Sequence, residues 1–352
     1  MSRIVDISNK NLADASHLFN CSIFKVEDQL YLAYRANQSY LDAKIYINKL
    51  NNTTYQPMGK PKPLNIPNTT TTAAAGWEDP RMFWYAGELY CAFVFIRAGF
   101  TAQAQGLAKL DKNFNVTRVW FLNYKRNLNS STIDTTRIMD PRGFITTAGA
   151  GSHFEKNWQF FQHGEELLFV YGSSPHTVAA ADLLQSKVKQ EYVSKVALPW
   201  SLGEIRGGTP PVDLGDKYIT FFHSSAKRDS DYRIYHIGAY TFEKTPPFNP
   251  IEISEVPLLS GDETDDYRGM WKNVVVFPCG ALKLDEKWLV SYGHNDYCSK
   301  LLSITHEEVL ANLTKINHAK PKQRRNKRRK GIQPCSGTGD SQEKQEGRSP
   351  LA

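Results

Sequence analysis

Apolar and polar residues alternate in short runs along most of this chain, which is the period of half-buried β-strands. Five segments repeat one layout: a short strand, a turn rich in glycine or charge, and a more apolar strand that ends in polar residues. These segments cover residues 20–36, 77–95, 153–174, 207–225 and 274–296. Their turns read EDQ, AGE, HGEE, LGDK and DEK, which are typical of β-hairpins.

Hairpins that recur every 50 to 75 residues or so, roughly one per blade, are typical of propeller blades with about four strands each. The pattern therefore predicts an all-β, five-bladed β-propeller over residues 1–316. A β-sandwich is the alternative, and the regular recurrence of the hairpins argues against it. Helical spacing is clearest at 305–316, where Leu310, Leu313 and Ile316 share one face, so we expect a short C-terminal helix.

Residues 317–352 have a different composition from the rest of the chain. They contain ten Lys and Arg against three Asp and Glu, a net +7 that equals the formal charge of the whole chain. Without an apolar periodicity, this segment is predicted to be a disordered, Lys/Arg-rich tail. It could solubilise the protein, act as a nuclear signal or contact a polyanion. Residues 1–316 are neutral overall, which does not favour a nucleic-acid groove.

The cysteines and the hydropathy bear on the compartment. The five cysteines form no Cys-x-x-Cys pair, and no Cys/His zinc spacing is present. Their odd count and the lack of a signal peptide predict reduced thiols in a cytoplasmic protein. No apolar run is long enough to suggest a membrane span.

Several common catalytic motifs are missing from the sequence. It has no Gly-x-Ser-x-Gly elbow, Walker loop, dinucleotide fingerprint or His-Glu-x-x-His. The commonest nucleophile, nucleotide-binding and zinc enzymes are therefore not indicated, and we expect no bound metal.

Polar residues recur where the predicted blades begin and where their hairpins end. In a propeller these positions meet around one axis, which is the geometry of a pocket. The candidates are Asn20, Arg35, Glu78, Asp79, Arg142, Lys156, Asn157, His223, Tyr235 and Asp296. Carboxylates and amides suit sugar hydroxyls, and cations suit an anion such as phosphate. The local alternative is that Asp79 and Arg81 only shape an Asp-Pro turn.

The motifs WEDPRMF, HFEKN, GGTPPV, YHIGAYTFE, VVFPCGA and VSYGHND, in this order, resemble glycoside hydrolase family 130 over residues 18–312. Members of that family are five-bladed propellers, and many are β-mannoside phosphorylases. Related propellers are glycosyltransferases that form mannosides. The resemblance implies a carbohydrate-active enzyme of inverting glycosyl transfer that catalyses phosphorolysis or synthesis of β-mannosides. A sugar-nucleotide-dependent glycosyltransferase is the alternative.

The resemblance also implies roles for single residues. Asp79 matches the general acid of the family. The expected substrate-binding residues are Asn20, Glu78, Asn157 and Asp296, and the expected phosphate-binding residues are Arg35, Arg142, Lys156, His223 and Tyr235. The chain departs from the usual family sequence at Asn157 and His294, where it resembles transferase-type relatives.

Phosphorolysis needs one carboxylic acid, because phosphate is already an anionic nucleophile, whereas inverting hydrolysis uses two. We therefore expect Asp79 to protonate the leaving oxygen while the cations hold phosphate on the opposite face of the sugar. The expected partners are an oligosaccharide or glycan and either inorganic phosphate or a sugar nucleotide, with no further cofactor. A non-catalytic glycan-binding propeller and a protein-interaction propeller are the remaining alternatives.

Overall fold

The computed structural model of the chain describes residues 3–37, 42–67, 74–97, 103–121, 126–128, 131–133, 156–228, 232–265 and 272–317. By its contacts the chain divides into two compact units, Met1–Ile316 and Asn317–Ala352. All strands and the helix named below belong to the first unit. Arg142 and the predicted disordered tail after residue 317 lie outside the described residues.

Four antiparallel sheets have four strands each. The first sheet consists of β2 (His17–Val26), β3 (Gln29–Asn37), β4 (Lys44–Leu50) and β5 (Pro57–Pro63). The second consists of β6 (Ala74–Tyr85), β7 (Glu88–Arg97), β8 (Gln103–Leu110) and β9 (Val116–Phe121). The third consists of β12 (Gln159–His163), β13 (Glu166–Ser173), β14 (His176–Asp182) and β15 (Lys187–Val193). The last consists of β22 (Val276–Leu284), β23 (Lys287–His294), β24 (Cys298–Thr305) and β1 (Arg3–Asp6).

A larger sheet precedes the last one along the chain. Its seven strands are β16 (Glu204–Arg206), β17 (Val212–Asp213), β18 (Lys217–Lys227), β19 (Arg233–Glu243), β20 (Pro250–Ser254), β21 (Leu259–Ser260) and β25 (Leu313–Lys315). A separate two-stranded ribbon joins β10 (Arg126–Leu128) and β11 (Ser131–Ile133).

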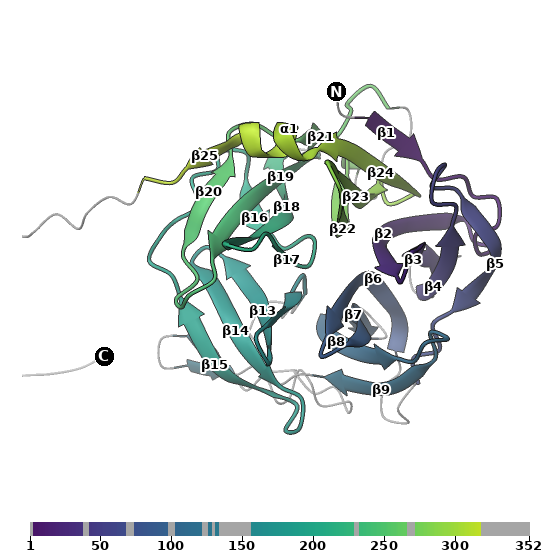
Figure 1. Ribbon diagram of the computed structural model, residues 1–352. Helices are drawn as coiled ribbons and strands as arrows, with labels where there is room; N and C mark the ends of the chain where they lie inside the picture. Colours follow the sequence, from purple (N-terminus) through teal and green to yellow (C-terminus); the bar gives the residue numbers. More distant parts are fainter. Residues whose placement is uncertain are drawn as a thin grey trace, which may run out of the picture. The chain divides into compact units, whose positions relative to one another are not determined.

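The sheets form a propeller-like arrangement around a common centre (Figure 1). Strand β2 contacts β6 on one side and β22 on the other, and β12 contacts β6. The third sheet contacts the larger sheet through β13 and β16, and β18 and β19 contact β22. The contacts therefore pass through every sheet and return to the first, so that the inner strands surround the centre.

The expected five blades are corrected to four four-stranded blades and the larger, irregular sheet. All five predicted hairpins are present as antiparallel pairs, including β17 with β18. The larger sheet differs because its inner edge is interrupted by the sequence GGTPP between β16 and β17. Proline has no N–H for the ladder, so the strand cannot continue through Pro210 and Pro211.

The expected helix over residues 305–316 is shorter in the structure. Helix α1 spans His306–Ala311 and begins with a capping box between Thr305 and Glu308. The next residues form β25, which pairs with β20 through Ile253 and Thr314. A long-range ladder has replaced the last helical turn, so the C-terminal segment joins the larger sheet after leaving the last one.

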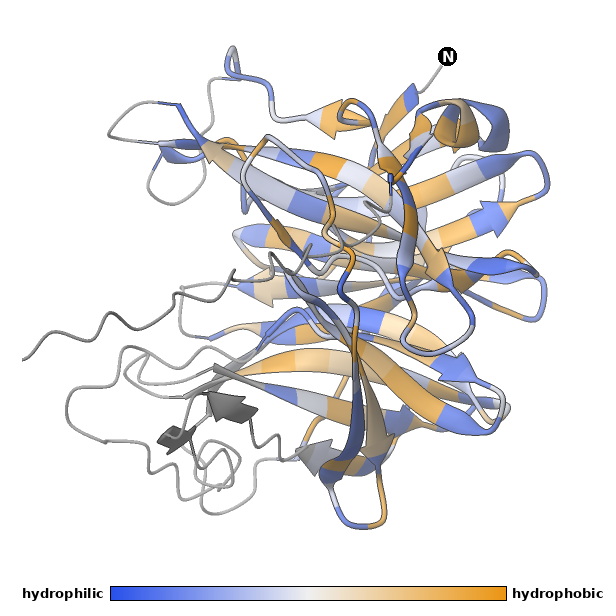
Figure 2. Ribbon diagram, turned by 90° about the vertical axis from the view of Figure 1, so that its left-hand side faces the viewer, coloured by the Kyte–Doolittle hydropathy of each residue, from blue (hydrophilic) through white to orange (hydrophobic). Residues whose placement is uncertain are grey.

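Apolar and polar residues alternate along the strands (Figure 2). The buried apolar residues form clusters that contain residues of neighbouring blades. Phe83 of the second sheet stacks on Phe160 of the third, with ring centroids 5.6 Å apart. Phe221 of the larger sheet meets Trp288 of the last sheet edge to face, with ring centroids 5.2 Å apart. Such aromatic contacts hold neighbouring sheets together.

No helix in the described part of the chain combines the length and apolar character needed to cross a membrane. The four cysteines there are free thiols, and Cys21, Cys91 and Cys279 are buried.

Candidate active site

Three blades place an Asn or Asp with a left-handed backbone at the same point of their inner edge. Asn20, Asp79 and Asn157 have φ angles of 49°, 53° and 66°. In each hairpin, the residue two positions further along pairs with the second strand. For Asp79 that residue is Arg81, which pairs with Ala92. Asn and Asp tolerate this conformation better than other residues with a Cβ. The repeated turn therefore explains the residue types at all three positions.

Asp79 is held by residues of the first blade. Nδ2 of Asn20 donates a 2.7 Å hydrogen bond to Oδ1 of Asp79. Nη1 of Arg35 lies 3.7 Å from the same oxygen, and Nη2 forms an ion pair with Glu78. Arg35 also donates from Nε to Asn37. All of these side chains are buried, so one cation of the neighbouring blade faces both carboxyl groups of the EDPR motif.

Two further carboxyl groups share this environment. Burial raises the pKa of Glu78 to about 7, against the lowering effect of Arg35, and the Asp79 charge raises it further. Burial likewise raises the pKa of Asp296 to about 6, and the charges of Arg35 and Asp79 act on it in opposite directions. Near neutral pH Glu78 is therefore partly protonated.

Arg81 connects three sheets at the centre. Its Nε donates to the Gly208 carbonyl at 2.6 Å, and its Nη2 donates to Oδ1 of Asn157 at 3.0 Å. Its Nη1 donates to the main-chain oxygen of Asp79 at 3.2 Å. The guanidinium is completely buried. Arg81 therefore fixes the turns that present Asp79 and Asn157.

Two glycines allow this close approach. A Cβ on Gly207 would overlap the carbonyl oxygen of Asn157, and one on Gly208 would overlap that of Phe221. The GGTPP segment therefore needs glycine because other main-chain atoms lie directly against it.

A second group of residues lies beside the carboxylates, around His223. This imidazole is buried, with the Tyr235 ring stacked at 6.0 Å and the Phe277 ring at 4.3 Å. Burial holds its pKa well below the usual value, and the charges of Arg206, Arg81 and Lys156 lower it further. His223 is therefore neutral at physiological pH, within a group of cations.

A cavity of about 310 Å³ opens beside this group. Its walls come from the start of the third blade, the β13–β14 turn and strand β16. They include Lys156, Asn157, Tyr171, Ser174, Glu204 and Arg206. The same Lys156 acts electrostatically on Glu78, Asp296 and His223, so one wall residue of the cavity links it to both groups.

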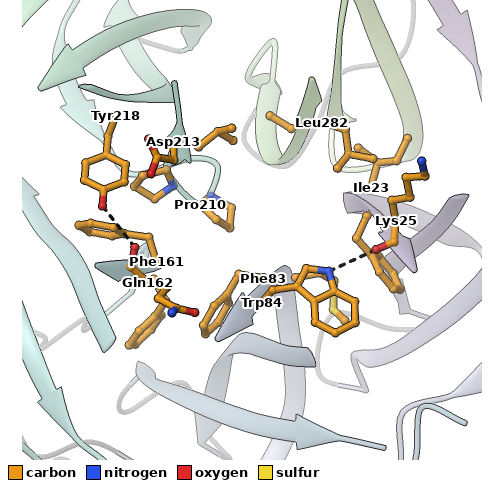
Figure 3. A pocket seen from close by; sticks show the side chains of 16 residues that line it. Ile23, Lys25, Phe83, Trp84, Phe161, Gln162, Pro210, Asp213, Tyr218 and Leu282 are labelled. Atoms are coloured by element: carbon orange, nitrogen blue, oxygen red, sulfur yellow. Dashed lines mark hydrogen bonds between the residues drawn. The ribbon is translucent and has the colours of Figure 1, made fainter. Parts of the chain in front are cut away.

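A larger cavity of about 370 Å³ lies at the opposite, hairpin-turn end of the inner strands (Figure 3). All five large sheets contribute to it, mainly with apolar side chains such as Phe83, Trp84 and Phe161. Its polar residues already have partners: Asp213 binds Lys244, and Gln162 binds the backbone at Ala86. The acidic and basic groups lie three or more residues away along each strand, so the polar end is the better candidate for catalysis.

The sequence profile of glycoside hydrolase family 130, described as β-1,4-mannooligosaccharide phosphorylase, matches residues 2–315. The chain belongs to glycoside hydrolase family 130. Members of family 130 are glycoside phosphorylases and hydrolases, so the protein is a glycosyl-transferring, carbohydrate-active enzyme. A sequence comparison with curated proteins finds no match.

Solved structures show the same fold. The β-1,2-mannobiose phosphorylase of Listeria innocua, in complex with β-1,2-mannobiose, is 13% identical with a TM-score of 0.61, covering 88% of this chain and 99% of its own. A family 130 structure described among glycoside hydrolases that target β-1,2-mannosidic linkages in Candida mannan is 13% identical, with a TM-score of 0.60 and coverages of 86% and 91%. A mannose phosphorylase of Leishmania mexicana, in complex with phosphate ion, is 11% identical, with a TM-score of 0.54 and coverages of 90% and 91%.

The structure brings most of the predicted site residues of this family 130 protein together, in two groups. Asn20, Arg35, Glu78, Asp79 and Asp296 form the acidic group, and Lys156, His223 and Tyr235 form the basic group, with Asn157 between them through Arg81. Arg35, one of the expected phosphate-binding residues, pairs with Glu78 and lies near Asp79. Arg142 lies outside the described residues.

Two arginines at this site were not among the predicted site residues. Arg81 was expected to serve its own turn, and its reach to Gly208 depends on a contact between distant blades. Arg206 precedes the Gly-Gly pair and lies opposite His223 in the β16–β18 ladder. A hairpin alignment that included this short strand would have paired the two residues. Within the described residues, no group of three or more His, Cys, Asp or Glu is placed to hold a metal ion.

Proposed function

We propose that the protein is a β-mannoside phosphorylase in which Asp79 is the general acid and inorganic phosphate is the nucleophile. The observation that supports this most is the separation of the site into an acidic and a basic group. Asp79 is held by Asn20 and Arg35, and the neutral His223 lies nearby among cations. One group suits proton transfer to a leaving oxygen, and the other suits an anion.

In the proposed reaction, protonated Asp79 gives its proton to the glycosidic oxygen, directly or through a sugar hydroxyl. A phosphate oxygen attacks the anomeric carbon from the opposite face while the bond to the glycosidic oxygen breaks. The products are a sugar 1-phosphate of inverted configuration and the shortened saccharide. Burial raises the pKa of Glu78 to about 7, so Glu78 is partly protonated near neutral pH and can return a proton to Asp79 after each turnover.

Two other outcomes use the same residues. Glu78 and Asp296 are additional carboxyl groups beside Asp79, and one of them acting as a base on water would give hydrolysis. A sugar nucleotide in place of the sugar phosphate would give a glycosyltransferase in which Asp79 is the base. The proposal includes no cofactor beyond the co-substrate.

The test is an analysis of products. Purified protein is incubated with β-linked mannobiose and longer mannooligosaccharides, with and without inorganic phosphate, and in the reverse direction with α-mannose 1-phosphate or GDP-mannose as donor. We expect mannose 1-phosphate to form only when phosphate is present. Release of free mannose without phosphate would indicate hydrolysis, and consumption of GDP-mannose alone would indicate the transferase.

The variant Asp79→Asn should abolish turnover while saccharide still binds. Asp28→Asn is the matched control, since Asp28 is a fully exposed carboxylate at a hairpin turn of the first blade. Full activity in Asp79→Asn would overturn the assignment of the acid.

A further inference from the structure

We propose that Arg206 is a further anion-binding residue of this site and that Glu204 competes with the anion for it. The Arg206–Glu204 pair would thereby set the affinity for the phosphate co-substrate. This inference rests on the proposed function and deepens it, because it names the residue pair that tunes the anion site.

Arg206 lies next to the basic group and on the wall of the cavity. Arg206 of β16 lies directly opposite His223 of β18 in the antiparallel ladder. Directly opposed residues project from the same face of a sheet, with Cβ atoms about 5 Å apart. Arg206 also lines the 310 Å³ cavity together with Lys156. Arg206 and Lys156 therefore border one cavity, and the His223 imidazole lies opposite Arg206 in the same sheet.

Among the described residues, Arg81 and Arg35 also lie near the site, and both are already engaged. Arg81 uses its guanidinium to hold Gly208, Asn157 and Asp79. The charge of Arg35 is taken up by Glu78 and Asp79. Neither can turn to a ligand without releasing the turns that form the site.

Arg206 is held much more loosely. Its Nη2 lies 3.5 Å from Glu204, and the two side chains are 38% and 71% exposed. Exposed pairs of this kind contribute little to stability and are easily exchanged. A phosphate oxygen in the cavity can therefore replace the Glu204 carboxylate, and the planar guanidinium can bind it through two N–H groups.

His223 supplies an independent sign of a ligand. Its Nδ1 is buried and has no hydrogen-bond partner among the described residues, whereas the main chain of Gly207 hydrogen-bonds the imidazole. Buried polar atoms are normally paired. A neutral imidazole that donates from Nε2 has an acceptor at Nδ1, which fits the P–OH of hydrogen phosphate. Sulfate, which has no such proton, is the natural comparison.

The experiment measures phosphate binding by isothermal titration calorimetry, with sulfate as the second probe. Arg206→Gln should weaken phosphate binding about tenfold, and Arg206→Lys should weaken it less, because a point charge remains. Glu204→Gln should tighten it about twofold to threefold, because the competing carboxylate is gone. The KM for saccharide should stay unchanged in all three. Arg118→Gln is the matched control, since Arg118 is exposed on β9 over the Trp120 ring.

Equal phosphate affinity in Arg206→Gln and the unaltered protein would overturn the inference and leave the proposed function standing. Unchanged or weaker phosphate binding in Glu204→Gln would show that Glu204 does not compete with the anion for Arg206. Because this variant changes only an exposed side chain, the result does not depend on how well Arg206→Gln folds. If the unaltered protein neither binds phosphate nor performs phosphorolysis, the proposed function fails, and this inference fails with it.

Discussion

Asn20 and Asp79, which lie in different blades, are joined by a 2.7 Å hydrogen bond from Nδ2 to Oδ1. The two residues occupy the same position in their hairpins and share a left-handed backbone. One blade thus orients the Asp79 carboxyl group of the next through a residue at the equivalent position. The site is an interaction between repeats and does not belong to any single blade.

Removing this bond should lower catalysis more than stability. Asn20→Gly keeps the left-handed φ accessible but deletes the side chain, so Asp79 loses its orienting donor. We expect kcat/KM for phosphorolysis to fall by about 10²-fold, the usual effect of a misplaced catalytic group. Asn11→Gly is the control, because Asn11 also has a positive φ but lies away from the site, bonded to Pro57. Equal losses in the two variants would contradict an orienting role.

Gly293 of the last blade leaves the space in which the Asn20 side chain makes this hydrogen bond. A Cβ at this position would overlap Oδ1 of Asn20 and approach its main chain. Gly293→Ala should therefore displace Asn20 and reduce activity strongly. Gly164→Ala, in an open hairpin turn with φ of 57°, should cost about 1 kcal/mol of stability and leave activity intact. Steady-state rates and thermal unfolding of both variants check this, and an active Gly293→Ala would rule out the steric argument.

Glu78 should make stability depend on pH. Its folded pKa is raised from 4.5 to about 7, mainly by burial. The unfolded chain releases this proton at lower pH than the folded protein, so stability falls as pH rises through that window. Glu78→Gln cannot ionise, and its melting temperature relative to wild type should therefore improve between about pH 5 and about pH 8.

The matched control for this series is Glu88→Gln, because Glu88 is an exposed carboxylate paired with Lys109. The difference in melting temperature between Glu88→Gln and wild type should stay constant over the same pH range. A level difference for Glu78→Gln as well would show that the Glu78 carboxyl is not destabilised by its surroundings.

The sequence was informative where the relevant interactions are local. The five hairpins follow from alternation and turn chemistry within about twenty residues, and all five are present. The prediction of a regular blade was wrong at GGTPP, because two prolines interrupt the inner strand between Arg206 and Val212. The helix was predicted too long because Thr314 pairs with Ile253, far away in the chain.

The site residues show the same division. Repeated positions at blade starts indicated Asn20, Asp79 and Asn157 as candidates, because the symmetry of the fold brings such positions together. The partners of the arginines could not be predicted in this way. Whether Arg35 binds a ligand or Glu78, and whether Arg81 serves its own turn or Gly208, is decided by contacts between blades.

The way the ring closes has a consequence for the order of folding. Strand β1 completes the last sheet by pairing with β24, with Val5 opposite Leu301, and the first hairpin packs against the last through β2 and β23. These contacts join segments almost 300 residues apart, so their loop-closure entropy must be paid before they form. A ribosome-bound chain that lacks Cys298–Thr305 cannot close this seam. Asp296 therefore comes near Asp79 and Arg35 only after synthesis of the last sheet, so the candidate site is complete only when the ring has closed.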